Sequence, residues 1–231
     1  MGKILPGIFI AFENPKGGAG KSTLTALFAG YLHSSAKDTG LKVGVIDIDD
    51  AQNSIGKMRI FDSKDEDVNE EYNVMNISSA DVRNQIKYLK ESFDIILIDF
   101  PGSLKQKGVV ETLMIIDILI IPFEPSKIEV SSTFDFYKFY AENILKIRNA
   151  QGYKTIVKGL PNRVLSNLLE YKDLVAAGAE GNLPFALLNN HIKESRVNLQ
   201  RNLSTLMKDY DNTYDAFGTE VLDIITEYIN N

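Results

Sequence analysis

Cysteine is absent from this chain, and its absence excludes several kinds of chemistry. Structural disulfides, a thiolate nucleophile and metal or iron–sulfur centres with cysteine ligands are all ruled out. Long apolar runs are lacking as well, because none approaches the ~18 residues of a membrane span. Residues 1–6 (MGKILP) also lack the apolar core of a signal peptide. We therefore expect a cytoplasmic protein with no membrane partner.

A surplus of positive charge is missing too. The formal net charge is −6, from 25 Lys and Arg residues against 31 Asp and Glu residues. Any binding to nucleic acid must therefore come from a local basic patch, since the chain as a whole does not attract phosphate. The length of 231 residues and the hydrophobic content of 44% suit one large α/β domain, which we expect to span residues 1–231.

A glycine-rich turn lies between a predicted strand and a predicted helix. Residues 8–12 (IFIAF) read as a buried strand, and residues 23–31 carry apolar side chains at helical spacing. Glycines in such a turn let backbone N–H groups converge on a phosphate, and the helix adds its positive N-terminal end. Lys21 would then lie among the β- and γ-phosphate oxygens of a nucleotide, and Ser22 would offer its hydroxyl to Mg²⁺.

The turn departs from the ordinary phosphate-loop pattern G-x-x-x-x-G-K-[ST]. Pro15 stands where the first glycine belongs, and an additional lysine, Lys16, precedes the glycines. This second cation cannot readily fold back onto phosphates that its own loop encloses, so it is free to reach a nucleotide on a second subunit. Lysine-bearing glycine-rich turns also occur by chance, and the flanking strand and helix are what favour a nucleotide site here.

The segment KGGAGKST at residues 16–23 resembles the deviant Walker A motif of the ParA/MinD family of dimerising ATPases. In that family the extra lysine crosses the dimer interface to the partner's ATP. The resemblance implies ATP and Mg²⁺ as cofactors and a doubly wound α/β fold of the SIMIBI-like P-loop NTPase kind. Its sheet would be mostly parallel, with about seven strands and helices on both faces. The nucleotide-binding residues that the motif implies are Gly17, Gly18, Ala19, Gly20, Lys21, Ser22 and Thr23.

Aspartates follow the next predicted strand, residues 42–48 (KVGVIDI). In doubly wound sheets, ligands lie at the carboxyl ends of the strands, where Asp47, Asp49 and Asp50 fall. The resemblance to the family's D-x-D-x-x-Q motif implies that Asp49 positions and polarises the attacking water, with Asp47 nearer the metal. Spacing alone does not rank Asp49 against Asp50. Strand-end aspartates also commonly cap the next helix, which is the alternative here.

A third strand, residues 93–99 (FDIILID), resembles Walker B. Its unbroken apolar run implies burial on both faces, and Asp99 emerges at its end, where it can hold a metal-bound water. The turn that follows is similar to the family's D-x-P-G turn. By that similarity the backbone N–H of Gly102 lies near the γ-phosphate, and the turn is a candidate switch between ATP and ADP states.

Four later segments complete the expected fold. Residues 79–92 predict a helix with Ser79 as its N-cap. Residues 117–123 predict a buried strand that Pro122 and Pro125 end. Residues 129–147 predict a long helix whose aromatic side chains suit core and interface packing better than a cofactor site. A strand begins at residue 155 and is expected to break at Gly159 and Pro161.

Asn162 follows that strand directly. The family commonly places an Asn-Arg or Asn-Lys pair at this point, where the amide reads the adenine ring. Asn162 is therefore a candidate for base recognition. An asparagine after a proline is just as naturally a turn residue, and the sequence leaves both readings open.

The local charge reverses sign near the C-terminus. Between residues 191 and 208 the cations Lys193, Arg196, Arg201 and Lys208 accompany a single anion, Glu194. Members of the ParA branch use basic residues in this region to hold DNA phosphates without reading bases, and Lys193 and Arg196 are the positions carried over. A solvated helix face is the alternative.

The terminal helix expected over residues 214–229 carries acidic residues and no Lys or Arg. A helix lying on a membrane would need basic residues against anionic lipid, so this segment is expected to pack in the core instead. A membrane cycle like that of MinD is therefore disfavoured. No helix-turn-helix segment precedes the first strand, so the closest resemblance is to the small ParA-type partition ATPases.

The resemblance implies a weak Mg²⁺-dependent ATPase that a ParB-like partner stimulates. Its ATP-bound homodimer would bind nonspecific DNA, associate with the nucleoid and segregate a plasmid, mobile element or chromosome. Two alternatives stay open: an ATPase that positions a protein cargo, and a small-molecule enzyme of the dethiobiotin-synthetase type, which predicts a deep substrate pocket. The catalytic residues implied are Lys16 (acting in trans), Lys21, Asp49 and Asp47, and the Mg²⁺ site is Ser22, Asp99 and Asp47.

Overall fold

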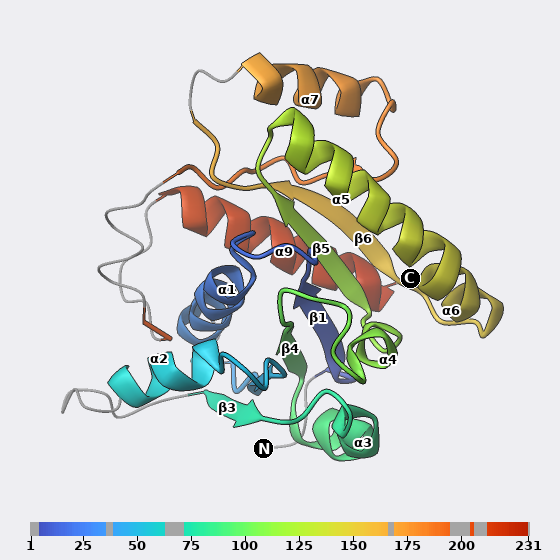
Figure 1. Cartoon of the computed structure of the whole chain (residues 1–231). Coiled ribbons are helices and arrows are strands. Elements are labelled where there is room, and N and C mark those ends of the chain that lie inside the picture. Colours follow the sequence, from blue (N-terminus) through green and yellow to red (C-terminus); the bar gives the residue numbers. More distant parts are fainter. Residues whose placement is uncertain are drawn as a thin grey trace.

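One parallel β-sheet runs through the protein, in a computed structural model that describes residues 5–35, 39–62, 72–165, 169–194, 204–205 and 212–230 (Figure 1). Within these residues the sheet has seven strands in the order β3-β2-β4-β1-β5-β6-β7, and all neighbouring strands are parallel. The strands are β1 (Ile8–Phe12), β2 (Val43–Asp47), β3 (Asn73–Asn76), β4 (Ile95–Asp99), β5 (Ile118–Phe123), β6 (Ile156–Pro161) and β7 (Ala186–Leu187).

Helices cover both faces of this sheet. One face packs against α1 (Lys21–Ser35), α2 (Ser54–Asp62) and α9 (Asn212–Asn230). The other face packs against α3 (Val82–Ser92), α4 (Val109–Leu113), α5 (Lys127–Tyr140) and α7 (Leu169–Ala179). A π-helical turn (Ala141–Leu145) and α6 (Lys146–Ala150) continue α5 without a break. The doubly wound fold predicted from the sequence is therefore confirmed, and the sheet is parallel throughout.

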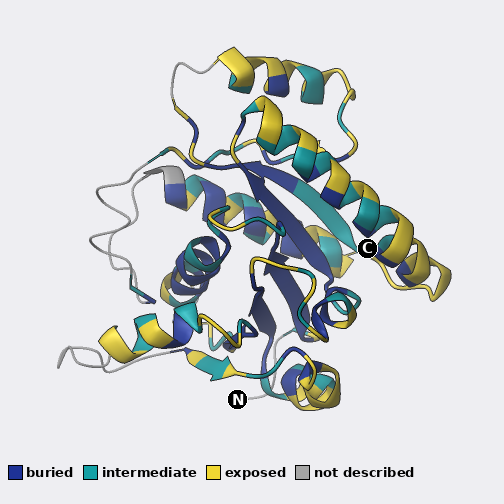
Figure 2. Cartoon of the chain, viewed as in Figure 1, coloured by how far each residue is buried: buried dark blue, intermediate teal, exposed yellow. Residues whose placement is uncertain are grey.

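The middle strands are buried along their whole length (Figure 2). Because helices cover both faces of the sheet, neither face of these strands meets solvent. The strands therefore consist of continuous apolar runs and do not alternate between apolar and polar residues. Their register also places the polar residues that follow them. Asp47 at the end of β2 pairs with Asp99 at the end of β4, so two of the predicted site residues lie on adjacent strands.

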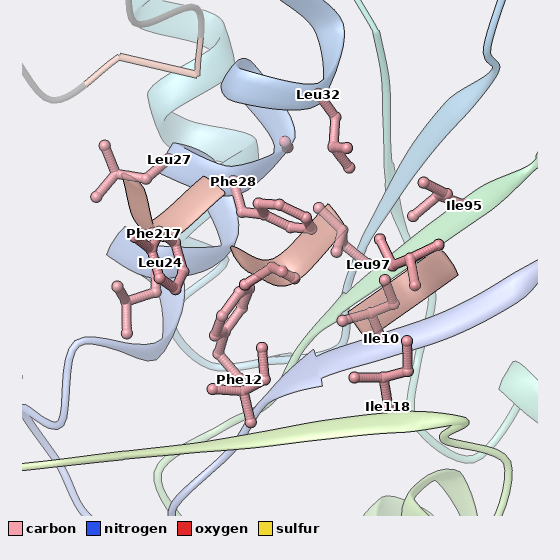
Figure 3. Packing of buried hydrophobic residues seen from close by; sticks show 14 of the residues in the cluster. Ile10, Phe12, Leu24, Leu27, Phe28, Leu32, Ile95, Leu97, Ile118 and Phe217 are labelled. Carbon is pink, nitrogen blue, oxygen red and sulfur yellow. The ribbon is translucent and has the colours of Figure 1, made fainter. Parts of the chain in front are cut away.

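Aromatic rings join the first and last parts of the chain in the core (Figure 3). The ring of Phe12 on β1 lies 5.9 Å from that of Phe28 on α1 and 5.9 Å from that of Phe217 on α9. Such edge and tilted contacts add to the stabilisation from burial. The terminal helix is thus a core helix, as the sequence predicted. In the described part of the chain no helix is long and apolar enough to span a membrane.

The expected N-cap at Ser79 is wrong. Asp81 occupies that position and α3 begins at Val82. The Ser79 hydroxyl donates instead to the backbone carbonyl of Lys107 at 2.6 Å. The cause is a tertiary contact, because Gly108 packs against the backbone of Ser79. A Cβ added at Gly108 would stand 2.4 Å from the Ser79 carbonyl oxygen. The loop after β4 therefore uses the side chain that would have capped the helix.

The break expected at Gly159 is also wrong, because β6 runs through Gly159 to Pro161, whereas the strand predicted over residues 117–123 is confirmed as β5, with Pro122 inside it. Pro122 has no N–H, which normally excludes proline from a central strand. Here the pairing of β5 with β1 extends only to Ile120. The carbonyl of Pro122 accepts a hydrogen bond from the Asn14 side chain at 3.0 Å, so it points to the side that β1 has already left.

The long aromatic helix packs as predicted. Tyr140 is fully buried, and the ring of Tyr137 lies 5.1 Å from that of Phe185, beside β7. The ring of Phe134 contacts the same partner, at 5.8 Å. These contacts fill the space between α5 and the sheet edge. The prediction that this helix serves the core is confirmed.

A buried ion pair fastens α6 to the amino end of the sheet. The Arg148 Nη2 atom lies 3.1 Å from Asp117 Oδ1, and both side chains are almost fully buried. Arg148 also donates to the carbonyl of Met114 at 2.5 Å and to the hydroxyl of Thr155 at 2.6 Å. The second oxygen of Asp117 accepts from the backbone N–H of Phe9 on β1. One guanidinium thereby links the ends of β1, β5 and β6.

Arg148→Met should therefore lower the free energy of unfolding by about 3–5 kcal/mol, because the Asp117 carboxylate is left buried without its partner. Urea unfolding followed by circular dichroism measures the change. Lys146→Met is the matched control, since Lys146 lies two residues away on an exposed position of the same helix and should change stability by less than about 0.5 kcal/mol. Equal effects of the two substitutions would contradict this account.

Candidate functional site

The loop between β1 and α1 has the backbone of a phosphate cradle. Gly18 and Gly20 adopt φ values of 82° and 90°, a left-handed conformation that favours glycine. A Cβ at Gly20 would stand 2.5 Å from the side-chain nitrogen of Asn162, so only glycine fits there without a shift. Helix α1 begins directly after the loop, at Lys21. Its free N–H groups and positive end therefore face the same space as the loop, which suits an anion.

Lys21 closes the inside of this loop. Its side chain is buried, and its ammonium donates to the backbone carbonyls of Asn14 at 3.1 Å and Lys16 at 2.9 Å. An ammonium has three N–H donors, so these two bonds leave one donor for a further acceptor. The predicted position of Lys21 at the phosphates agrees with this geometry, although the role itself stays a prediction.

Asp99 supplies a buried carboxylate next to the loop. It is fully buried, and neither carboxylate oxygen makes a well-aligned hydrogen bond within the described residues. Burial raises the pKa of Asp99 to about 8, while the nearby Ser22 hydroxyl acts in the opposite direction. Oxygen atoms buried without partners are unfavourable unless a cation or donor meets them. Ser22 and Asp99 are therefore chemically suited to Mg²⁺, which prefers hydroxyl, carboxylate and water oxygens.

Asp47 ends β2, and Asp49 lies in the loop that follows, residues 48–53, here named the aspartate loop. One oxygen of Asp47 accepts from the N–H of Asp49, and the other accepts from the N–H of Ile55 at the start of α2, each at 3.0 Å. Asp49 in turn accepts from the N–H groups of Ala51 and Gln52. The helix-capping alternative is thus what this structure shows for Asp47. Burial raises the pKa of that carboxyl group.

The loop after β4, residues 100–108, lies against the phosphate loop and is here named the switch loop. A Cβ at Gly102 would stand 3.7 Å from both the Cα and the N of Gly17. The sequence places these two glycines 85 positions apart, and the adjacent pairing of β1 with β4 brings them together. Gly102 therefore lies against the phosphate loop, and its predicted contact with the γ-phosphate stays a prediction.

Asn162 also contacts the phosphate loop. Its side-chain nitrogen donates to the Ala19 carbonyl at 2.9 Å, and its side-chain oxygen accepts from the N–H of Arg163. Arg163 has a φ of 55°, so the oxygen supports a strained turn. The turn alternative is therefore what these contacts show, and recognition of the base by Asn162 stays a prediction. A small pocket of about 70 Å³ opens beside it, lined by Gly17, Gly18, Ala19, Glu124, Glu129, Asn162 and Arg163.

Lys16 pairs with an acidic residue of α5, which also lines the pocket at the phosphate loop. Its ammonium forms an ion pair with the Glu129 carboxylate in the first turn of α5, and about a third of each side chain is exposed. Lys16 therefore has a partner within the chain before any second subunit arrives. Glu129 was missed from the sequence, because its 113-residue separation from Lys16 leaves no local signal.

Glu13 is the second residue that the sequence interpretation missed. It directly follows β1 and is fully buried, and neither carboxylate oxygen has a hydrogen-bond partner within the described residues. Burial raises the pKa of Glu13 to about 8, and the charge of Lys21 partly opposes this effect. The available signal was an acidic residue between an apolar strand and a glycine-rich turn. The loop thus has buried carboxyl groups on two adjacent strand ends, at Glu13 and Asp99.

The predicted DNA contacts lie at the edge of what the structure describes. Lys193 is exposed and forms a backbone bridge with Val164, so its side chain is accessible near the carboxyl end of β6. Arg196 lies outside the described residues, as do Arg201 and Lys208. The expected basic surface therefore stays a prediction.

The chain belongs to the CobQ/CobB/MinD/ParA nucleotide-binding domain family, whose sequence profile matches residues 10–230. The ParA/MinD resemblance drawn from the phosphate loop is thereby confirmed. A comparison with curated protein sequences finds no significant match.

Solved structures show the same fold at low sequence identity. A plasmid partition protein of Borrelia burgdorferi bound to AMPPNP matches with a TM-score of 0.63 and 20% identity, over 98% of this chain and 100% of that chain. McdA of Cyanothece in complex with ATP matches at 0.66 and 21%, over 99% and 98%. Cobyrinic acid a,c-diamide synthase of Mycobacterium smegmatis with an ATP analogue and magnesium matches at 0.66 and 16%, over 97% and 96%.

The buried carboxyl groups predict a pH-dependent stability. Glu13 holds its proton up to about pH 8 when folded, against a reference pKa of 4.5. Unfolding therefore releases a proton between these values, and the free energy of unfolding falls as the pH rises through that window. The raised pKa of Asp99 acts with the same sign. Glu13→Gln should remove part of this fall.

Thermal unfolding from about pH 5 to about pH 8 tests this expectation. At about pH 8 the Tm of Glu13→Gln should be at least the wild-type Tm and up to about 2–4 °C above it. Between about pH 5 and about pH 8 the Tm of the variant should also decline less than that of wild type. Glu170→Gln, at an exposed position of α7, makes the same chemical change and should keep the wild-type slope. A wild-type slope in Glu13→Gln would contradict the burial argument.

Proposed function

We propose that this chain is a Mg²⁺-dependent ATPase of the ParA type. The observation that carries the proposal is the arrangement of the phosphate loop, in which the Lys21 ammonium is held inside a left-handed glycine turn beside the buried Asp99 carboxylate. Membership of a nucleotide-binding family supports it. Similar structures that hold AMPPNP, or an ATP analogue with magnesium, support ATP and Mg²⁺ as the cofactors.

The residues of this loop bind and orient the nucleotide in the proposed mechanism. Backbone N–H groups of residues 17–22 and the start of α1 hold phosphate oxygens, and Lys21 neutralises their charge. Ser22 and Asp99 would hold Mg²⁺, with Asp47 beside them. When bound, Mg²⁺ neutralises the charge on the β- and γ-phosphate oxygens. Asp49, which lies in the aspartate loop next to Asp47, orients the attacking water, and Asn162 contacts the base.

A sandwich homodimer completes the proposed enzyme. Lys16 leaves Glu129 and reaches the partner's nucleotide when ATP joins the two subunits. Apolar side chains beside the pocket support a surface that a second copy covers, since Ile128 is 78% exposed and Leu165 is 54% exposed. The proposed dimer binds nonspecific DNA through Lys193 and Arg196, associates with the nucleoid in the cytoplasm, and releases DNA when a ParB-like partner stimulates hydrolysis. Its cargo is a plasmid, mobile element or chromosome.

A small-molecule enzyme is the second candidate, because the fold is shared with cobyrinic acid a,c-diamide synthase. Such an enzyme needs a substrate pocket beside the nucleotide. Within the described residues, the pocket at the loop has about 70 Å³, whereas small-molecule sites usually occupy about 300–1,000 Å³. The additional Lys16 also has no role in such an enzyme. Both observations favour the dimeric ATPase.

Lys16→Ala should abolish ATP-dependent dimerisation while leaving nucleotide binding within about threefold of wild type, because this lysine serves the other subunit's nucleotide. Light scattering with a non-hydrolysable ATP analogue measures the mass, and calorimetry measures binding. Lys138→Ala, at an exposed position of α5, is the matched control and should dimerise normally. A dimer of Lys16→Ala with unchanged affinity would refute the proposed dimer mechanism.

Lys193→Glu combined with Arg196→Glu should weaken ATP-dependent retention on nonspecific DNA by about tenfold or more, and should reduce the salt dependence of binding. The control is Arg83→Glu with Lys87→Glu, which makes the same change of charge at exposed positions of α3 and should leave retention unchanged. Binding to a random-sequence duplex is measured over a series of salt concentrations. Unchanged retention in the first variant would place the DNA surface elsewhere on the protein.

A further inference from the structure

One side chain joins the two loops on either side of the proposed γ-phosphate position. The Gln106 side-chain nitrogen, in the switch loop, donates to the Ile48 carbonyl at 2.8 Å and to Asp50 Oδ2 at 3.0 Å, both in the aspartate loop. It also donates to the Ser79 hydroxyl oxygen at 3.0 Å. The two hydrogens of the amide are therefore shared among three acceptors from two other loops.

Further contacts hold the end of the switch loop against the segment that contains Ser79. The Ser79 hydroxyl donates to the carbonyl of Lys107, and Thr112 contacts the Ser79 carbonyl through its own hydroxyl at 3.3 Å. Gly108 allows this close approach with a φ of 88°. The end of the switch loop therefore has little freedom to move relative to residue 79, and Gln106 extends from an anchored base.

The other end of the switch loop reaches the nucleotide site. Gly102 approaches Gly17 of the phosphate loop, as described above. On the aspartate loop, Asp49 is the neighbour of Asp50 and is bound to the backbone of that same loop. A movement at Gly102 therefore has a short covalent path to Gln106, and from there a hydrogen-bonded path to the residue proposed to orient water.

We propose that Gln106 is a positioning residue for ATP hydrolysis, which couples the switch loop to the aspartate loop and so holds Asp49 in register with the bound phosphates. This inference rests on the proposed ATPase. The amide is suited to the task because it is neutral and offers two donors to a carbonyl and a carboxylate. It acts on the chemical step through Asp49 and makes no contact with nucleotide, so its loss lowers kcat and leaves affinity almost unchanged.

Gln106→Glu is the decisive variant. It keeps the length of the side chain, removes both N–H donors and sets a carboxylate against Asp50 and the Ile48 carbonyl. We expect kcat for ATP to fall about tenfold or more, with the Kd for a non-hydrolysable ATP analogue within about twofold of wild type. Gln85→Glu on α3 is the matched control, since Gln85 is exposed and should leave both values unchanged.

A double-mutant cycle with Asp50→Asn separates positioning from general damage. With Asp50→Asn in place, the introduced amide can donate to the carboxylate of Gln106→Glu, which restores the contact between positions 50 and 106 in the opposite direction, although the bond to the Ile48 carbonyl stays lost. Gln106→Glu should then cost less than about threefold in kcat, whatever Asp50→Asn costs alone. An equal loss in both backgrounds, no loss in either, or a loss of affinity in place of kcat would overturn the proposal.

Hydrogen exchange distinguishes failure of this inference from failure of the proposed function. Residues 48–53 and 100–108 should exchange faster together in Gln106→Glu than in wild type or Gln85→Glu, with or without nucleotide. If wild-type protein neither binds nor hydrolyses ATP, the proposed function is wrong, and exchange still decides whether the loops are coupled. If wild type hydrolyses ATP and the two loops exchange independently, only the role of Gln106 is wrong.

Discussion

The buried ammonium of Lys21 is the interaction on which the rest of the site depends. A cation that is only 6% exposed needs acceptors, and the chain provides two loop carbonyls as well as buried carboxyl groups on the adjacent strand ends. The carbonyls curl the loop around the ammonium, and the glycines permit that curl. Loop shape, helix start and local charge are therefore set together, which favours a site that is formed before a ligand arrives.

The parallel sheet explains why so many polar groups meet at this edge. Strands β1, β2 and β4 are neighbours and run in one direction, so Glu13, Asp47 and Asp99 follow their strands at the same end. The apolar strands exclude water, and the pKa values of Glu13 and Asp99 rise to about 8 for that reason. Gln106 then links two of the loops at this edge, which gives the site a mechanical connection as well as an electrostatic one.

Much of the architecture was predictable because it rests on local patterns. The apolar runs predicted β1, β2 and β4 to within about two residues, and the glycine-rich turn indicated the family. The expectations that failed concern residues whose local preference was overridden by a distant neighbour. Ser79 gives its hydroxyl to the switch loop, and Gly159 lies inside β6, where the ring of Phe185 packs against it. Neither neighbour is visible within a short window of sequence.

The sequence by itself predicted strands β1, β2, β4 and β5, the phosphate-loop chemistry and the identity of Lys21, Asp47 and Asp99 as residues near it, because each depends on a short periodic or spaced pattern. It did not predict β3, α2, α4 or α7. Only the tertiary structure decided which groups are partners. It placed Glu129 against Lys16, Asn162 against Ala19 and Gln106 against Asp50. The two residues of each pair are separated by more than 50 positions, and the order of the strands in the sheet brings them together. A local sequence pattern therefore cannot indicate these contacts.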